Sequence, residues 1–388
     1  MKHQVNRSIA AGIIAVIVFI ALPISIAFSQ TSISVLQFLG YNSNSFYNYR
    51  QLSDVDDYIG LKVKRIIEGE KIQSQLFYNG DLNFYKSYSE RLYHNQMMGY
   101  DGYIASGNNK KIVYFGANWL WHDGRDIYNV YDFWKVTGYA NLKKYFRSNL
   151  IGFFGYQLNN RNYAELEEFS YWEHYFFTRL NTFFQTRTSI TLDINYGLKD
   201  YIPLQISSGR GRRVAAEFVE MPGVDQLVTS IKVAQSIGEK NAINAKYLNR
   251  LNPGLVAGSA SVMNSDELFT EDELFDDRYG YRGHEFSLGY TQYLPAYIKL
   301  ELGWHYYLKS YLNRQIYDLE GNVSLSGDFR EDTRRLFWAG LSRSFGINRG
   351  MKTVKVSLEG GYLKNESNDS YYHYDNLWIS SGLEFRIK

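Results

Sequence analysis

The stretch Tyr297–Lys309 reads YIKLELGWHYYLK and alternates between two kinds of residue. One set is apolar: Ile298, Leu300, Leu302, Trp304, Tyr306 and Leu308. The other set carries charge, with Lys299, Glu301, His305 and Lys309. Successive side chains of a β-strand point to opposite faces, so this pattern predicts a strand with one apolar and one polar face. On a helix the charged residues would scatter around the axis and leave no apolar stripe.

The same period of two recurs along most of the chain. It is clear in Asp57–Ile67, Lys71–Leu82, Ser189–Lys199 and Lys352–Leu363. Weaker segments fill the gaps between these: Ile33–Tyr41, His94–Ser106, Lys111–Asp123, Val130–Tyr145, Leu150–Asn159, Tyr171–Phe184, Gln226–Ile237, Ala242–Leu251, Tyr281–Leu294, Thr333–Phe345 and Asn376–Lys388. Together they predict about sixteen strands, an even number, as a closed antiparallel barrel requires.

The joints between these strands alternate between short and long. The short ones are Glu68–Lys71, Gly107–Lys110, Phe146–Asn149, Gln185–Thr188, Gly238–Asn241, Pro295–Ala296 and Ile347–Met351. The long ones are Asn42–Val55, Tyr85–Tyr93, Gly124–Asn129, Arg161–Ser170, Asp200–Asp225, Asn252–Gly280, Asn313–Glu331 and Asn365–Asp375. This rhythm predicts an all-β transmembrane barrel with short periplasmic turns and long extracellular loops. Both ends of the barrel segment then lie in the periplasm.

The composition supports a barrel in a membrane. Aromatic residues make up 17% of the chain, with 35 Tyr and 24 Phe, and Tyr suits the boundary between lipid and water. Only 5 Pro occur, as expected where the N–H groups of a sheet must be paired. With 0 Cys, the chain has no disulfide, no thiol chemistry and no Cys-ligated metal. We expect no cofactor and no metal site.

The N-terminus resembles a cleavable secretory signal covering residues 1–29, followed by a barrel domain over 30–388. Lys2 and Arg7 precede an apolar run, Ile9–Phe28, and Ala27-Phe28-Ser29 supplies a small-residue cleavage site. The alternative is an uncleaved anchor helix, because the run is long enough to span a bilayer. Cleavage would remove two positive charges and bring the formal net charge from +2 to 0. A nucleic-acid partner therefore has no support.

Across Ile33–Lys388, the chain resembles bacterial outer-membrane β-barrels, and among them the 16-stranded porin-like class. Aromatic clusters where strands meet long loops, including Trp119, Trp121 and Trp172, resemble one of the two aromatic girdles of such barrels. The last strand, LWISSGLEFRIK, resembles the terminal signal read by the barrel-assembly machinery, although Phe385 is not the final residue. The resemblance implies outer-membrane lipid and lipopolysaccharide as surroundings and leaves a homo-oligomer possible.

Basic residues exceed acidic ones on the face predicted to line the lumen. The basic set is Lys62, Lys64, Lys135, Lys143, Arg179, Lys199, Lys232, Lys246, Arg250, Lys299, Lys309, Lys355 and Arg386. The acidic set is Asp81, Asp101, Glu173, Asp193, Glu285, Glu301, Glu359 and Glu384. Wall charges select ions, so this excess predicts a mild anion preference. The alternative is that these charges pair across strands in a filled interior. Our candidate pore-lining residues are Arg179, Lys246, Arg250, Lys299, Glu301, His305 and Lys309.

Two long loops carry clustered charge. Asn252–Gly280 contains Asp266, Glu267, Glu271, Asp272 and Glu273, which could bind Ca²⁺, form a constriction or simply lie in solvent. Their spacing matches no known calcium loop. Asp200–Asp225 contains Arg210, Arg212 and Arg213, which could attract anionic solutes or lipopolysaccharide phosphates, or form a flexible basic loop.

An enzymatic barrel would need a nucleophile and a base with an orienting group. After signal removal the histidines are His94, His122, His174, His284, His305 and His373, and none accompanies a serine motif. We therefore expect no enzyme. The sequence predicts an outer-membrane channel that passes small polar solutes. The alternative is a non-conducting barrel whose long loops bind a surface, secretion or assembly partner, and inward Tyr114, Tyr139, Tyr175 and Trp338 would favour it.

Overall fold

A computed structural model of the chain describes residues 31–106, 110–208, 215–219, 223–254, 279–316, 318–320, 322, 327–347 and 352–387, without the side chains of 204–219 and 313. The predicted signal segment 1–29 lies outside these residues. Within the described part of the chain, helix is limited to short 3-10 turns, and none is long and apolar enough to span a membrane.

Sixteen strands form the wall, as the alternating pattern predicts. They are β1 (Thr31–Asn42), β2 (Asp54–Glu68), β3 (Gln73–Tyr85), β4 (Tyr93–Ala105), β5 (Lys111–Gly124), β6 (Phe133–Arg147), β7 (Leu150–Tyr163), β8 (Tyr171–Phe183), β9 (Thr188–Tyr201), β12 (Val224–Ile237), β13 (Asn241–Leu251), β14 (Tyr281–Leu294), β15 (Ile298–Gln315), β16 (Phe329–Ile347), β17 (Lys352–Ser367) and β18 (Tyr374–Ile387).

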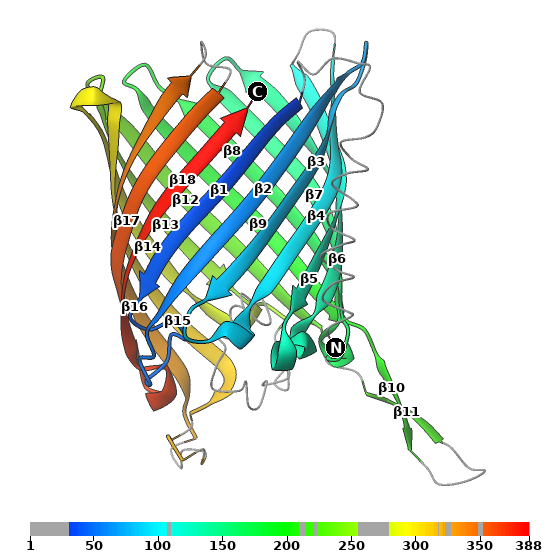
Figure 1. Cartoon of the computed structure of the whole chain (residues 1–388). Helices are drawn as coiled ribbons and strands as arrows, with labels where there is room; N and C mark the ends of the chain where they lie inside the picture. The colour runs from blue at the N-terminus through cyan, green and yellow to red at the C-terminus, as the bar shows by residue number, and fades with distance from the viewer. Residues whose placement is uncertain are drawn as a thin grey trace.

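Each strand pairs antiparallel with its neighbours, and β1 pairs with both β2 and β18, so the sheet closes on itself (Figure 1). Closure leaves no edge strand with unpaired N–H and C=O groups, which is the condition for a sheet to stand in lipid. The predicted all-β, 16-stranded antiparallel barrel is confirmed.

The two ends of the barrel differ. Short turns join β2 to β3, β4 to β5, β6 to β7, β8 to β9, β12 to β13, β14 to β15 and β16 to β17, and β1 begins and β18 ends beside them (Figure 1, top). The longer connections lie at the opposite end. We call the two halves of the barrel the short-turn half and the long-loop half. The alternation of joints is thus confirmed.

Two details differ from the sequence prediction. The loop between β9 and β12 contains its own hairpin, β10 (Leu204–Ser208) and β11 (Ala215–Val219), which projects from the long-loop end (Figure 1). Several wall strands also run further into the loops than expected, such as β15, which reaches Gln315. Period-two hydrophobicity reveals only the band that faces lipid, and beyond that band both faces of a strand are polar.

The first loop fastens the seam between β1 and β18 at the long-loop end. The backbone N–H of Ser43 donates to the Leu377 carbonyl at 2.8 Å, and the Asn44 N–H donates to Asn376 Oδ1 at 3.0 Å. The Asn44 side-chain amide donates to the carbonyls of Asn48 and Asp375 at 2.7 and 3.2 Å. Asn44 is fully buried, so these bonds satisfy polar groups that water does not reach.

Candidate functional site

The pairing register shows which residues share the lumen face. Residues directly opposite each other in a sheet point to the same side. One such row runs from Lys232 through Lys246, Ser287 and His305 to Leu336. The other face of these strands carries exposed apolar side chains, including Leu302, Phe337 and Leu377. By this register, all the charged residues predicted to face the lumen do so, together with Tyr114, Tyr139, Tyr175 and Trp338.

Lumen-facing charges in the long-loop half are buried. Glu173 and Lys199 lie opposite each other on β8 and β9, with only 2% and 4% of their surfaces exposed. Glu173 accepts hydrogen bonds from Asn159 Nδ2 at 2.8 Å and from the Tyr279 hydroxyl at 2.5 Å. Lys199 Nζ lies 4.1 Å from the centroid of the Tyr171 ring. These contacts hold both charges away from bulk water.

The same packing recurs on β15 and β16. Arg330 and Asp332 form a buried two-bond ion pair, with Nη2–Oδ2 at 2.6 Å and Nε–Oδ1 at 3.0 Å. The Arg330 guanidinium lies 3.3 Å from the centroid of the Tyr372 ring. Lys309, opposite Asp332, places its Nζ 4.4 Å from the centroid of Tyr281. Arg330 is therefore held by an aromatic face and a carboxylate, and Lys309 is held by an aromatic face and lies opposite the same carboxylate.

Buried cations stacked on aromatic rings form a set around the long-loop end of the lumen. We call this set the buried belt, and it consists of Arg91, Arg161, Lys199, Lys309 and Arg330. Sequence reasoning placed two of these residues, Lys199 and Lys309, in the lumen but missed the stacking. A Tyr or Phe beside each cation near the long-loop end of its strand is the only signal that could have indicated it.

Lumen-facing charges in the short-turn half are accessible. Arg179 and Asp193 pair at 2.5 Å while the Arg179 side chain stays 54% exposed. Lys299 pairs with Glu301 at 2.7 Å, and Arg386 pairs with Glu384 at 2.7 Å. Arg179 and Asp193 thus pair across two neighbouring strands, whereas the other two pairs each lie within one strand. Among these residues, pairing across strands, the alternative to an anion-selective wall, is found only for Arg179 and Asp193.

A subset of lumen lysines in the short-turn half makes no ion pair with another described residue. Lys232 is exposed and lies directly opposite Lys246 on the neighbouring strand. The other exposed members of the subset are Lys62, Lys64 and Lys355. Lys246 is half-buried and interacts electrostatically with Glu285. The exposed lysines give their part of the wall a positive field.

The remaining candidate residues lie at the boundary of the halves or join side-chain networks. Arg250 donates to Gln226 Oε1 at 2.6 Å and lies over the Tyr281 ring. Tyr139 donates to Asp101 Oδ1 at 2.7 Å. Trp338 lies against the wall where Gly303 has no side chain, because a Cβ there would come within 2.0 Å of Trp338 Nε1.

The arrangement around His305 does not form a nucleophile–base pair. The Ser287 hydroxyl donates to Glu285 Oε1 at 2.8 Å, so a carboxylate and not the imidazole receives this proton. His305 Nδ1 lies 3.5 Å from the same carboxylate oxygen, and its Nε2 accepts from Trp338 Nε1 at 3.4 Å. An imidazole oriented by a carboxylate at Nδ1 would use Nε2 as the base, and here Nε2 contacts the indole of Trp338 and not a nucleophile.

The turn between β5 and β6, at the long-loop end, contains a pair of carboxyl groups. Asp132 Oδ1 accepts the Gly124 N–H at 2.6 Å, and Asp132 shares a hydrogen bond with Asp123. Burial, together with the Asp123 carboxyl, raises the pKa of Asp132 to about 8. Asp123 also lies 3.2 Å from His94 Nε2. Among the described residues, no group of three or more His, Asp or Glu is placed to hold a metal ion.

Both charged loop clusters singled out in the sequence fall outside the described residues. These are Arg210, Arg212 and Arg213 in one loop, and Asp266, Glu267, Glu271, Asp272 and Glu273 in the other. Their roles remain predictions.

The described geometry can be compared with that of known proteins. No family model matches the sequence, and no curated protein matches it. Among solved structures, OpdL of Pseudomonas aeruginosa aligns with a TM-score of 0.50 at 12% identity, over 93% of this chain and 99% of that one. The outer membrane protein OpdK of the same species gives 0.48 at 10% identity, over 93% and 100%. OccAB1 of Acinetobacter baumannii gives 0.46 at 12% identity, over 92% and 96%.

At these identities the likeness to OpdL shows the fold. The chain therefore has the architecture of a 16-stranded, porin-like transmembrane β-barrel, and the resemblance predicted from the sequence is confirmed at that level.

Proposed function

We propose that this protein is an outer-membrane channel that passes small polar solutes with a mild preference for anions. The observation that carries the proposal is the set of exposed lumen lysines without ion pairs among the described residues, above all Lys232, which lies opposite the half-buried Lys246. Their field acts over about 8–10 Å at ordinary salt, so it reaches solutes that pass close to this part of the wall. We further propose that the short turns, the start of β1 and the end of β18 lie on the periplasmic side of the membrane.

Conductance of the purified protein in planar bilayers tests the proposal. In a KCl gradient we expect discrete open steps with a reversal potential on the anion-selective side. The double substitution Lys232→Gln and Lys246→Gln should move the reversal potential towards the cation side. The control is Lys144→Gln with Arg343→Gln, because both of these cations share the outer face with exposed apolar residues. The control pair should leave the reversal potential unchanged.

A second function keeps one specific observation in its favour. This function is a non-conducting barrel whose long loops bind a partner. The buried belt packs charged and aromatic side chains into the long-loop half of the lumen, as such a barrel would require. Folded protein that gives no conductance at any voltage would contradict the channel and support this reading.

The histidine geometry offers no support for catalysis, and we propose a protein that is not an enzyme. A lipase or esterase assay of the folded barrel in detergent, with Ser287→Ala as the matched variant, should give no turnover that depends on this serine.

A further inference from the structure

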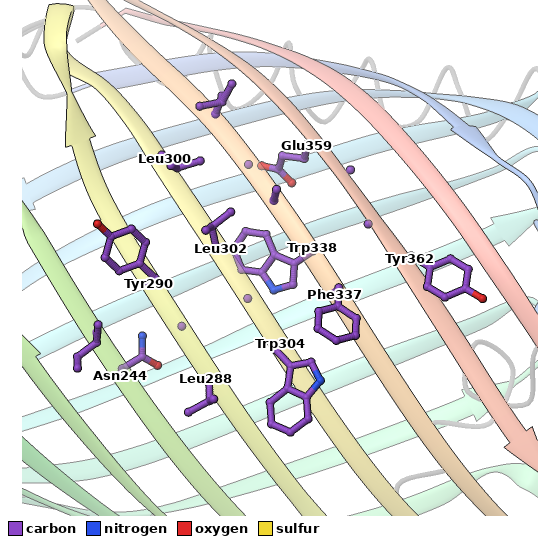
Figure 2. A pocket seen from close by; sticks show the side chains of 18 of the residues that line it. Asn244, Leu288, Tyr290, Leu300, Leu302, Trp304, Phe337, Trp338, Glu359 and Tyr362 are labelled. Carbon is purple, nitrogen blue, oxygen red and sulfur yellow. The ribbon is translucent and has the colours of Figure 1, made fainter.

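The outer wall of the barrel has an apolar hollow across β12–β18, and most of the residues that line it belong to the outward rows of the pairing register. The hollow measures about 1260 Å³, which exceeds the roughly 300–1,000 Å³ of pockets that hold drug-sized ligands. Figure 2 shows Leu302, Trp304, Phe337 and Tyr362 among the side chains that line it.

The pairing register explains the hollow. One outward row contains Trp304, Phe337 and Tyr362, which are large. The next row towards the short turns contains Leu302, Ala339 and Gly360 in succession, and the row after that contains large residues again. Two small residues side by side between rows of large ones leave a depression in the wall at Ala339 and Gly360.

Charged residues lie beyond the edge of the hollow nearest the long loops, outside its lining. Arg335 and Lys364 lie opposite each other on β16 and β17. They form the next outward-facing pair after Phe337 and Tyr362 in the direction of the long loops. Both contact Glu366, with Arg335 Nη2–Oε2 at 3.1 Å and Lys364 Nζ–Oε1 at 2.8 Å. The two cationic side chains remain 45% and 42% exposed.

The other acid at this edge already has donors. Asp375 lies opposite Lys364 and accepts from Gln51 Nε2 at 2.7 Å and from the Tyr362 hydroxyl at 3.2 Å. An arginine has five N–H donors and a lysine has three, so one carboxylate between them uses only part of their capacity. The pair can therefore bind a further anion without releasing Glu366.

The position of these cations indicates the kind of anion. They lie directly above an aromatic row, and aromatic rows in barrels lie at the level of the lipid headgroups. Phosphate is the anion that Arg and Lys bind most readily at that level. Acyl chains attached to the same molecule would lie below it, where the apolar hollow is.

We propose that Arg335, Lys364 and the hollow at Ala339 and Gly360 form a binding site for a phosphorylated, multiply acylated lipid of the leaflet at the long-loop end. The phosphate contacts the two cations, and an acyl chain fills the hollow. A second barrel is a poorer occupant, because a stiff convex wall does not fill the depression at Ala339 and Gly360 within the hollow. The site does not require conduction, but it rests on the location and orientation in the outer membrane proposed above.

Native mass spectrometry of the folded protein in detergent tests the site, with diphosphoryl lipid A as the probe. We expect wild-type protein to retain one lipid A per chain and to retain the chemically dephosphorylated lipid much less. Arg335→Gln with Lys364→Gln should weaken retention roughly ten- to thirtyfold, because each cation near the surface contributes to the attraction of an anionic lipid. Ala339→Phe should weaken retention by filling the hollow.

The matched control is Arg343→Gln, an outward cation on the same strand at the short-turn end, which should leave retention unchanged. Heat-modifiable migration on a gel verifies that each variant is folded, and conductance should be the same in all of them. Equal retention of both lipids by every variant would overturn the proposal. A dimer that Ala339→Phe dissociates, with no bound lipid, would also overturn it and assign the hollow to a second copy.

Discussion

Arg330 in the long-loop half and Arg179 in the short-turn half each pair with an aspartate on the lumen face, but in different surroundings. The Arg330 and Asp332 side chains are only 4% and 0% exposed, whereas Arg179 is 54% exposed beside Asp193. In the first case two aromatic rings cover the cation, and in the second case water does. The lumen therefore combines a packed half, which holds the long loops in place, with an accessible half, whose charges can act on a solute.

Arg330→Ala should produce the largest loss of stability. It leaves the Asp332 carboxylate buried without its partner, which costs about 3–5 kcal/mol in other proteins. The free energy of unfolding, from urea titration of the barrel in lipid vesicles, measures the effect. A loss below about 1 kcal/mol would mean that the buried ion pair of the long-loop half contributes no more to stability than the exposed pair of the short-turn half.

Asn44→Ala should have the next largest effect. It removes the donors to the Asn48 and Asp375 carbonyls and leaves buried polar groups unsatisfied, at about 1–3 kcal/mol. The same urea titration measures it. Asn368→Ala in the loop between β17 and β18 is a control, because Asn368 is exposed. Similar losses for both variants would show that burial of Asn44 is not the cause.

A rise in pH should loosen the turn between β5 and β6. The pKa of Asp132 is raised in the folded protein, so the protonated form stabilises the fold. That stability is fully present below about pH 4, the unfolded pKa, and is lost as the pH rises through about 8. Hydrogen exchange at the Gly124 N–H, corrected for the intrinsic pH dependence, reports the opening.

Asp132→Asn should remove this pH dependence, while Asp126→Asn, at an exposed acid of the same turn, should keep it. A pH dependence that survives in the Asp132 variant would assign it to another group.

Arg179→Ala should have the smallest effect on stability, about 0–1 kcal/mol, because its ion pair is open to water. Its effect should appear in conduction instead, as a shift of the reversal potential towards the cation side once Asp193 has lost its partner. A large loss of stability without any shift of the reversal potential would mean that Arg179 has a structural role, like the cations of the long-loop half.

The architecture could be predicted from the sequence because a strand in a barrel wall separates lipid from lumen at every second residue. The faces on which Lys299 and Leu302 lie can therefore be assigned from the alternating pattern of their own strand, without knowing which strands lie beside it. The short turns were equally visible, since so few residues separate the periodic segments. The extended strand ends were not visible, because polar residues on both faces give no periodic signal. The β10–β11 hairpin was not visible because its strands have only 5 residues each, too few to show a period.

The division of the lumen could not be predicted for a different reason. Burial of Lys199 depends on Tyr171 and Tyr279, which lie on other segments, and no local pattern in the sequence brings them together. The outer hollow has the same origin, because Ala339 and Gly360 become neighbours only through the register of β16 and β17. Contacts between distant segments decide both features.

The fastening of the first loop onto the last strand also bears on how the barrel forms. The Ser43 hydroxyl and Asn376 meet across a sequence separation of 333 residues. The free-energy cost of closing a loop grows only with the logarithm of its length, by about 0.6 kcal/mol for each doubling. The long sequence separation therefore adds little to the cost of this contact. Its formation must nevertheless wait until the last strand is available. The seam is therefore a late event in folding, and substitutions at Asn44 or Asn376 should chiefly speed unfolding and leave the early steps of folding unchanged.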